Sequence, residues 1–105
     1  AASGDVTTGI WGDGRVGVFR GLAYERQAVG WGLTVFGSQS ICQVRLPAEY
    51  PPLLREIVRF FRGGAAPVSE VELLELFGFM EAADASLAAG GAAVRVEDCL
   101  RRAGI

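Results

Sequence analysis

The sequence predicts an α+β fold, because its hydrophobic period changes near residue 50. Up to Leu46, β-branched and aromatic residues occur in short runs broken by glycine-containing turns, which is typical of strands. From Pro51 onward, apolar residues recur at three- and four-residue steps, which indicates amphipathic helices. We therefore expect one domain over residues 1–105, with an open antiparallel sheet of about four to five strands and two helices packed on one face.

The strands fall into two predicted hairpins within a sheet over residues 5–46. Segments 6–11 and 15–20 flank Gly12, Asp13 and Gly14, and an Asp-Gly pair favours the positive φ of a tight turn. Segments 31–36 and 41–46 flank a second turn at 37–40. The longer polar segment 22–30 is expected to connect the two hairpins as a loop.

The two sides of the predicted sheet differ in composition. Strand alternation places a mixed set of aromatic and polar side chains on one side, as in the centre of an interface, and a more uniformly apolar set on the other, which is the better candidate core. The first set is Trp11, Phe19, Phe36 and Ile41 with Thr7, Arg15, Thr34 and Gln43; the second is Ile10, Val16, Val18, Leu33, Val35, Cys42 and Val44.

Helices are predicted over residues 51–62 and 69–89. Prolines 51 and 52 suit the first turn of the first helix, and glycines 63 and 64 end it. Ser69 and Glu72 have the spacing of a capping box at the start of the second. Glycines 90 and 91 are expected to end that helix in a left-handed cap. Its predicted buried stripe is Leu73, Leu74, Phe77, Met80 and Ala83. A short strand is expected at 94–96, followed by a terminal turn of helix at 97–103.

The composition excludes several classes of chemistry. A formal net charge of −2, with ten arginines and no lysine, supplies no basic field for nucleic acid. A chain without histidine cannot contain a Ser-His-Asp or Cys-His arrangement, and it lacks the commonest metal ligand and general base. We therefore expect no metal site, no catalytic residue and no nucleic-acid partner.

The cysteines and the hydropathy of the chain give two further expectations. Cys42 and Cys99 match no zinc or redox spacing, so we expect two buried, reduced thiols. No apolar run approaches the roughly 18 residues that a membrane span needs, and no basic segment precedes an apolar one. The expectation is a cytoplasmic location, with no membrane partner and no targeting segment.

One glycine motif invites a cofactor hypothesis. Residues 12–17 match the G-x-G-x-x-G pattern of dinucleotide-binding folds. In those folds the glycines open a helix whose amides face the pyrophosphate, whereas here Val16 and Val18 continue a predicted strand. The pattern therefore favours a hairpin turn and no cofactor-binding residue.

Three further groups keep both a functional and a structural interpretation. Glu81 and Asp84 could pair for acid-base or metal chemistry, or simply form a solvated helix edge. The strand arginines could bind an anion if they converge, or form the rim of an interface; these are Arg15, Arg20 and Arg45. In the connecting loop, Tyr24 and Arg26 could contact a substrate, or lie in an ordinary exposed connection.

The helical part also carries a family resemblance. The runs Tyr50 to Phe61, Pro67-Val68-Ser69 and Phe79 to Asp84, followed by the pair Gly90-Gly91, occur in an order that resembles the carboxy-terminal end of the glucose-fructose oxidoreductase, inositol dehydrogenase and rhizopine-catabolism family. The hairpin at Trp11 to Gly14 and the run Thr34 to Gly37 are similar to the sheet of its sugar oxidoreductase branch. The resemblance covers nearly the whole chain.

The resemblance implies a substrate-side and oligomerisation domain of an NAD(P)-dependent sugar or polyol oxidoreductase, inactive by itself. NAD(P) would bind an amino-terminal Rossmann domain, in cis or in trans, that this sequence does not contain; the family's catalytic lysine and histidine have no counterpart here. A homo-oligomer would form through the open sheet face, with Trp11, Phe19, Thr34 and Phe36 in the interface. The alternative is a stand-alone binding or assembly module that uses the same aromatic face.

Overall fold

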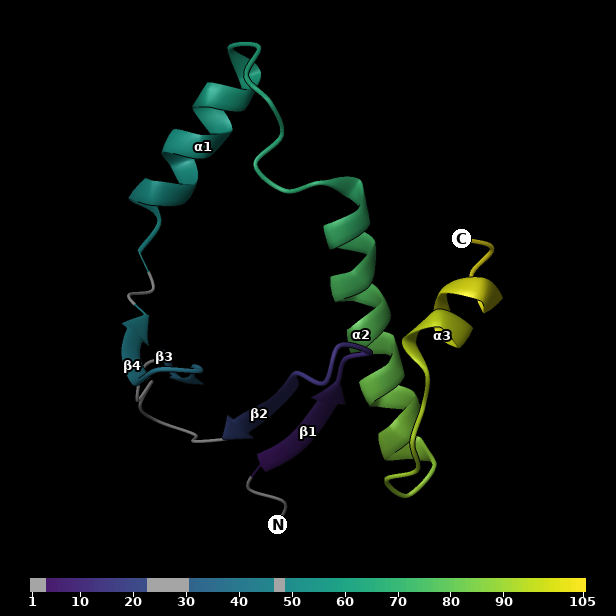
Figure 1. The fold of residues 1–105 in the computed structure, drawn as a ribbon. Coiled ribbons are helices and arrows are strands. Elements are labelled where there is room, and N and C mark those ends of the chain that lie inside the picture. Colours follow the sequence, from purple (N-terminus) through teal and green to yellow (C-terminus); the bar gives the residue numbers. More distant parts are fainter. Residues whose placement is uncertain (1–3, 23–30, 47–48) are drawn as a thin grey trace. The chain divides into compact units, whose positions relative to one another are not determined.

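The computed structural model describes residues 4–22, 31–46 and 49–105. Its elements are four strands followed by three helices, so the α+β class is confirmed (Figure 1). The strands are β1 (Gly4–Ile10), β2 (Val16–Leu22), β3 (Trp31–Phe36) and β4 (Ile41–Leu46). The helices are α1 (Pro51–Phe61), α2 (Glu70–Ala88) and α3 (Val96–Arg102). The chain divides into two compact units, residues 1–55 and 56–105.

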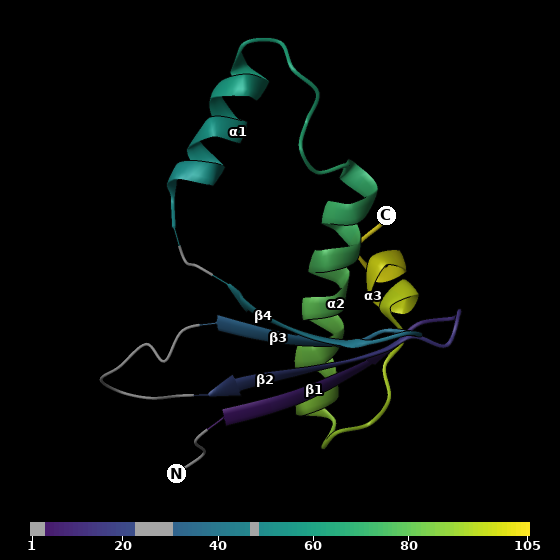
Figure 2. The same cartoon turned by 60° about the vertical axis from the view of Figure 1, so that its left-hand side comes forward.

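The strands form two antiparallel hairpins, each a separate two-stranded sheet (Figure 2). In the first, Thr7 pairs with Phe19 and Ile10 with Val16; in the second, Leu33 pairs with Val44 and Phe36 with Ile41. The prediction of one sheet of four to five strands is therefore wrong. Each turn fixes the register of its own hairpin, but pairing between hairpins depends on non-local contacts that local sequence patterns do not encode.

The first turn takes the conformation that its glycine predicts. Gly14 has a φ of +92°, its N–H donates to the Trp11 carbonyl at 3.0 Å, and the Trp11 N–H donates to the Arg15 carbonyl at 2.9 Å. Only glycine adopts this left-handed backbone without steric cost. The glycine motif at residues 12–17 therefore forms the turn of a β-hairpin and the start of β2. The predicted hairpin is confirmed, and the motif does not open a helix as it does in a dinucleotide-binding fold.

Helix α1 forms where the periodic pattern predicted it, and Gly63, with a φ of +91°, follows its last turn. Its apolar stripe includes Leu53, Leu54, Ile57 and Phe61, yet no residue of α1 is buried. Arg59 and Glu56, one turn apart on the polar side of the helix, form an ion pair. The helix is therefore amphipathic but uncovered, and the predicted packing of helices on a sheet face stays a prediction.

Helix α2 begins with the predicted capping box. The Ser69 hydroxyl accepts the Glu72 N–H at 3.1 Å, and the Glu72 carboxylate accepts the Ser69 N–H at 3.3 Å. At the other end Gly90 has a φ of +73°, and the Gly91 N–H donates to the Ser86 carbonyl at 2.8 Å. Both ends of the helix therefore satisfy backbone groups that an uncapped helix leaves open.

The closest tertiary packing in the second unit is between α2 and α3, which lie side by side in both ribbon views (Figures 1 and 2). Gly78 and Ala82 on α2 are buried, as is Cys99 on α3. The predicted buried stripe was wrong in detail: Leu73, Phe77 and Met80 are exposed. Because α2 is apolar on more than one side, periodicity could not identify the side that packs, whereas small residues let the two helices approach closely.

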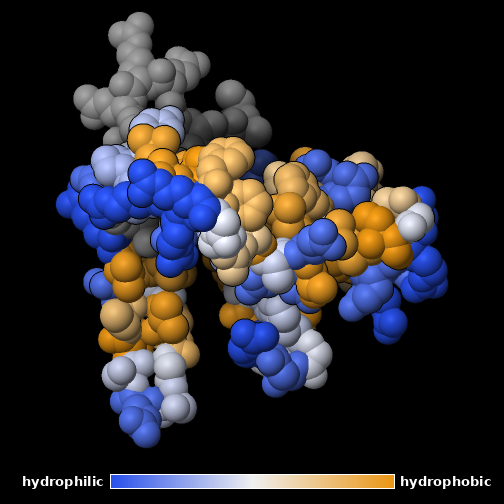
Figure 3. Space-filling model, turned by 90° about the horizontal axis from the view of Figure 1, so that it is seen from above, coloured by the Kyte–Doolittle hydropathy of each residue, from blue (hydrophilic) through white to orange (hydrophobic). Residues whose placement is uncertain are grey.

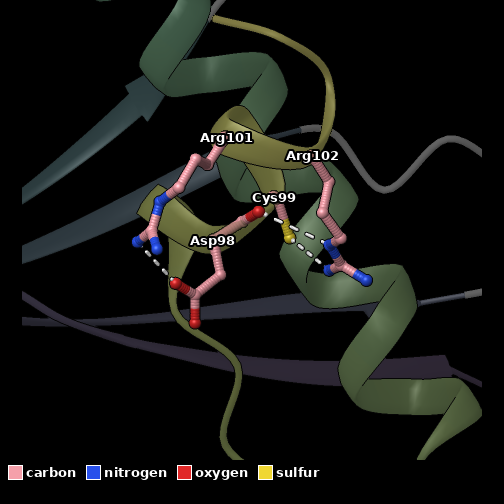
Figure 4. A network of polar contacts seen from close by, with 4 residues as sticks. All are labelled: Asp98, Cys99, Arg101 and Arg102. Atoms are coloured by element: carbon pink, nitrogen blue, oxygen red, sulfur yellow. Dashed lines mark hydrogen bonds and ion pairs between the residues drawn. The ribbon is translucent and has the colours of Figure 1, made fainter.

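The carboxy-terminal segment contains no strand at 94–96. Arg95 is extended, with φ −81° and ψ 130°, but it is the cap residue of α3, which starts at Val96. Within α3 the Asp98 carboxylate pairs with Arg101 at 2.8 Å, and Arg102 reaches the Cys99 sulfur at 3.4 Å (Figure 4). The predicted strand is therefore wrong, because the extended backbone at Arg95 pairs with none of the described strands, whereas the predicted turn of helix at 97–103 is confirmed as α3.

Gly78 sets the approach of α2 to α3, and its substitution tests that contact. A Cβ at position 78 would lie 2.9 Å from Val96 Cγ1 and 3.0 Å from Leu100 Cδ2. Overpacking costs about 1–3 kcal/mol, while alanine in place of a helical glycine returns about 1 kcal/mol. We expect Gly78→Ala to lower the free energy of unfolding by about 1 kcal/mol net in a denaturant titration followed by circular dichroism.

The double variant Gly78→Ala/Val96→Ala is the control, because it removes the nearer methyl group from the clash. Gly78→Ala should lower the free energy of unfolding less in the Val96→Ala background than it does in the wild-type chain. A Gly78→Ala protein that gains the full helix-propensity increment would contradict the close contact.

Candidate interaction surfaces

The hairpins expose the aromatic residues that the sequence singled out. Phe19 is 57% exposed and Phe36 is 77% exposed, and Thr34 is exposed on the same strand as Phe36. The pairings place Phe19 opposite Thr7 and Thr34 opposite Gln43, so each hairpin has the mixed aromatic and polar face that alternation predicted. Phe19 and Phe36 therefore lie on two separate sheets, and the described strands do not form the predicted single face that contains both.

Trp11 lies at the tip of the first hairpin, next to the turn. Its ring atoms Cζ3 and Cη2 lie 3.2 and 3.3 Å from the position that a Cβ on Gly17 would occupy, and the Arg15 guanidinium lies 5.8 Å from the ring centroid. A cation at that distance is attracted to the aromatic face. Because Gly17 has no side chain, the Trp11 indole can pack closely over its backbone on the mixed face of the hairpin.

The candidate core face of the hairpins is exposed as well. Burial was predicted for this set, yet Ile10, Val16, Val18, Leu33 and Val35 are all exposed, as is Cys42. Among the hydrophobic residues that the structure describes, Ala82 and Cys99 are the buried ones, at 6% and 4% exposure. Hydrophobic side chains accordingly reach the surface over much of the face seen in Figure 3.

The candidate polar groups that the structure describes are exposed or paired with a residue close by in sequence. Glu81 and Asp84 are exposed on α2, which agrees with a solvated helix edge. Arg15 pairs with Asp13, while Arg20 and Arg45 belong to different sheets. Within residues 4–22, 31–46 and 49–105, no three His, Cys, Asp or Glu residues could hold a metal ion together. Tyr24 and Arg26 lie outside the described residues.

Comparisons with known proteins leave the surfaces without a precedent. No family model, no curated protein and no solved structure matches the chain. Of the helices described, none is long and apolar enough to cross a membrane. The exposed apolar faces of the hairpins and helices are therefore the main functional clue in the structure.

The hydrogen bonds of Asp13 in the first turn predict a lowered pKa for its carboxyl group. The Asp13 carboxylate accepts the Arg15 backbone N–H at 3.1 Å and pairs with its Nε at 2.8 Å. These two bonds, the backbone one foremost, hold the pKa of Asp13 below its ordinary value of 3.8. A carboxyl with a lowered folded-state pKa adds stability that is present above its unfolded pKa and is lost as pH falls through the folded pKa.

We expect an NMR titration of the carboxyl carbon to give a pKa for Asp13 below 3.8. In Arg15→Ala the pKa should rise but stay below that value, because the backbone N–H remains as a donor. An Asp13 carboxyl that titrates normally in the wild-type chain would rule out the turn geometry.

The two cysteines offer a direct test of exposure, since both were predicted to be buried and only Cys99 is. A maleimide reagent should label Cys42 rapidly under native conditions, because its sulfur is on an exposed strand. Cys99 should react only as the α2–α3 contact opens. The Cys42→Ser variant retains only Cys99, so it should be labelled only slowly. Rapid labelling of both thiols in the wild-type chain would contradict the packing of α3.

Proposed function

We propose that this chain is a non-catalytic module that works by contact with other polypeptide. In particular, it would form the substrate-side and oligomerisation part of an NAD(P)-dependent sugar or polyol oxidoreductase. The observation that carries the proposal is the exposure of apolar side chains on both hairpins and on α1. Monomeric domains rarely leave contiguous apolar surface uncovered, so a large exposed share favours an interface.

The oxidoreductase part of the proposal is supported by the ordered resemblance in residues 50–61, 67–69, 79–84 and 90–91. The structure places those residues at α1, at the cap of α2, within α2 and at its carboxy-terminal end. In such an enzyme the nicotinamide would bind a Rossmann domain, and the reaction would move hydride between a carbinol carbon and the cofactor. This chain would supply walls and subunit contacts.

A second candidate, a stand-alone assembly module, is favoured by one observation. The resemblance implies an open sheet larger than a hairpin, whereas the strands here form two separate two-stranded sheets. A hairpin alone is marginally stable in water. Cover from a partner protein would stabilise it whether or not that partner binds nicotinamide.

The two candidates make different predictions for cofactor binding. Calorimetric titration of the isolated chain with NAD and with NADP should give no binding heat under either candidate. The full product of the same gene, purified together with any Rossmann-domain chain that binds it, should bind one of the two nucleotides if the oxidoreductase proposal is right. A full-length product that binds neither nucleotide would leave the assembly module in its place, and binding by the isolated chain would overturn both.

A further inference from the structure

Helix α2 has a second apolar face besides the one that contacts α3. Gly78 and Ala82 face α3 and are buried. At 100° per residue the opposite side carries apolar residues at heptad spacing, and the large ones are exposed. This seam consists of Leu73, Leu76, Met80, Ala83 and Leu87. It has the a and d spacing with which one helix packs against another.

The charge of α2 restricts what can cover the seam. The helix contains five acidic residues and no basic one, and Glu72 and Asp84 border the seam on its two sides. A second α2 laid against the first would place two helices side by side that each carry five acidic residues and no basic one, and two helices of like net charge repel each other. A symmetric pair of α2 helices is therefore the wrong occupant, and the seam calls for a helix with positive charge.

Helix α1 has that chemistry. Leu54, Ile57 and Phe61 recur at three- and four-residue steps along its stripe, and Phe61 is 80% exposed. Within α1, Arg55 and Arg59 outnumber Glu56, and Arg62 follows directly after the helix, so α1 and α2 have net charges of opposite sign. At about 1.5 Å per residue, the eleven residues of α1 span about the same length as the seam between Leu73 and Ala83.

We propose that α1 of one copy packs on the α2 seam of a second copy. The exchange is reciprocal, so a dimer with twofold symmetry contains two equivalent α1–α2 contacts. The arginines of α1 lie away from its stripe, so the opposite charges act through their long-range field rather than through direct ion pairs. This contact uses surfaces separate from the hairpin faces, and it stands whether or not the proposed oxidoreductase function is right.

The proposal is tested by sedimentation equilibrium of the 105-residue chain and two disruptive variants. Phe61→Asp puts an acidic group against acidic α2, and Leu76→Arg puts a basic group against basic α1. Both side chains are exposed in a single copy, so circular dichroism should show an unchanged helix content. The wild type should form a dimer that weakens in high salt, and each variant should dissociate at least about tenfold more readily.

Mixing the two variants distinguishes exchange between copies from packing within one copy. In a mixed dimer, one contact joins the intact α1 of the Leu76→Arg chain to the intact α2 of the Phe61→Asp chain, and the other contact carries both changes. The mixture should therefore associate at least about tenfold more tightly than either variant alone. Packing of α1 on α2 within one chain would give no such recovery.

Phe36→Asp, which changes a hairpin face, is the matched control. It should leave the mixing effect intact, even if it weakens an interface through the sheet face. A monomeric wild type, a mixture no tighter than its components, or a dimer that dissociates in Phe36→Asp but in neither Phe61→Asp nor Leu76→Arg would each overturn helix exchange. In the last case the sheet-face interface of the proposed function would survive.

Discussion

The structure depends on one constraint: a strand or helix with an apolar face is stable only when that face is covered. Turns, caps and ladders satisfy backbone groups within the local elements, as at Gly14 and Ser69. Cover for the side chains is far less complete, because the buried residues in the described part of the chain are Gly9 on β1 and the small residues where α2 meets α3. The uncovered faces, rather than any polar cluster, therefore carry the functional argument.

The contrast between α1 and α2 shows how the same constraint produces different surfaces. Gly78 allows α3 to approach α2 closely, and the two helices bury Ala82 and Cys99 between them. Helix α1 has an equally clear apolar stripe but no buried residue. Apolar area removed from water contributes about 25 cal/mol per Å² to the free energy of folding. The exposed stripe of α1 therefore leaves the hydrophobic stabilisation of several side chains unused. A partner helix or sheet would recover it.

Much of the local structure could be predicted from the sequence, because its signals are local. An Asp-Gly pair, a Ser-x-x-Glu cap and terminal glycines act within a few residues, and each forms as expected. The joining of β1–β2 to β3–β4 failed as a prediction, since it depends on pairings between distant segments. The buried side of α2 failed because Leu73 and Gly78 lie on different apolar faces, and Cys42 failed because a thiol on an apolar strand face looks buried in sequence alone.

The candidate surfaces follow the same division. Alternation correctly grouped Phe19 with Thr7 and Thr34 with Gln43 on one face of their hairpins, but it could not show that both faces of each hairpin are exposed. The dependence of the thermal unfolding midpoint on protein concentration tests this account most directly, because an association that covers apolar faces stabilises the folded chain by mass action. We predict a midpoint that rises steadily with concentration. A midpoint independent of concentration would contradict the claim that copies of this chain cover one another's apolar faces.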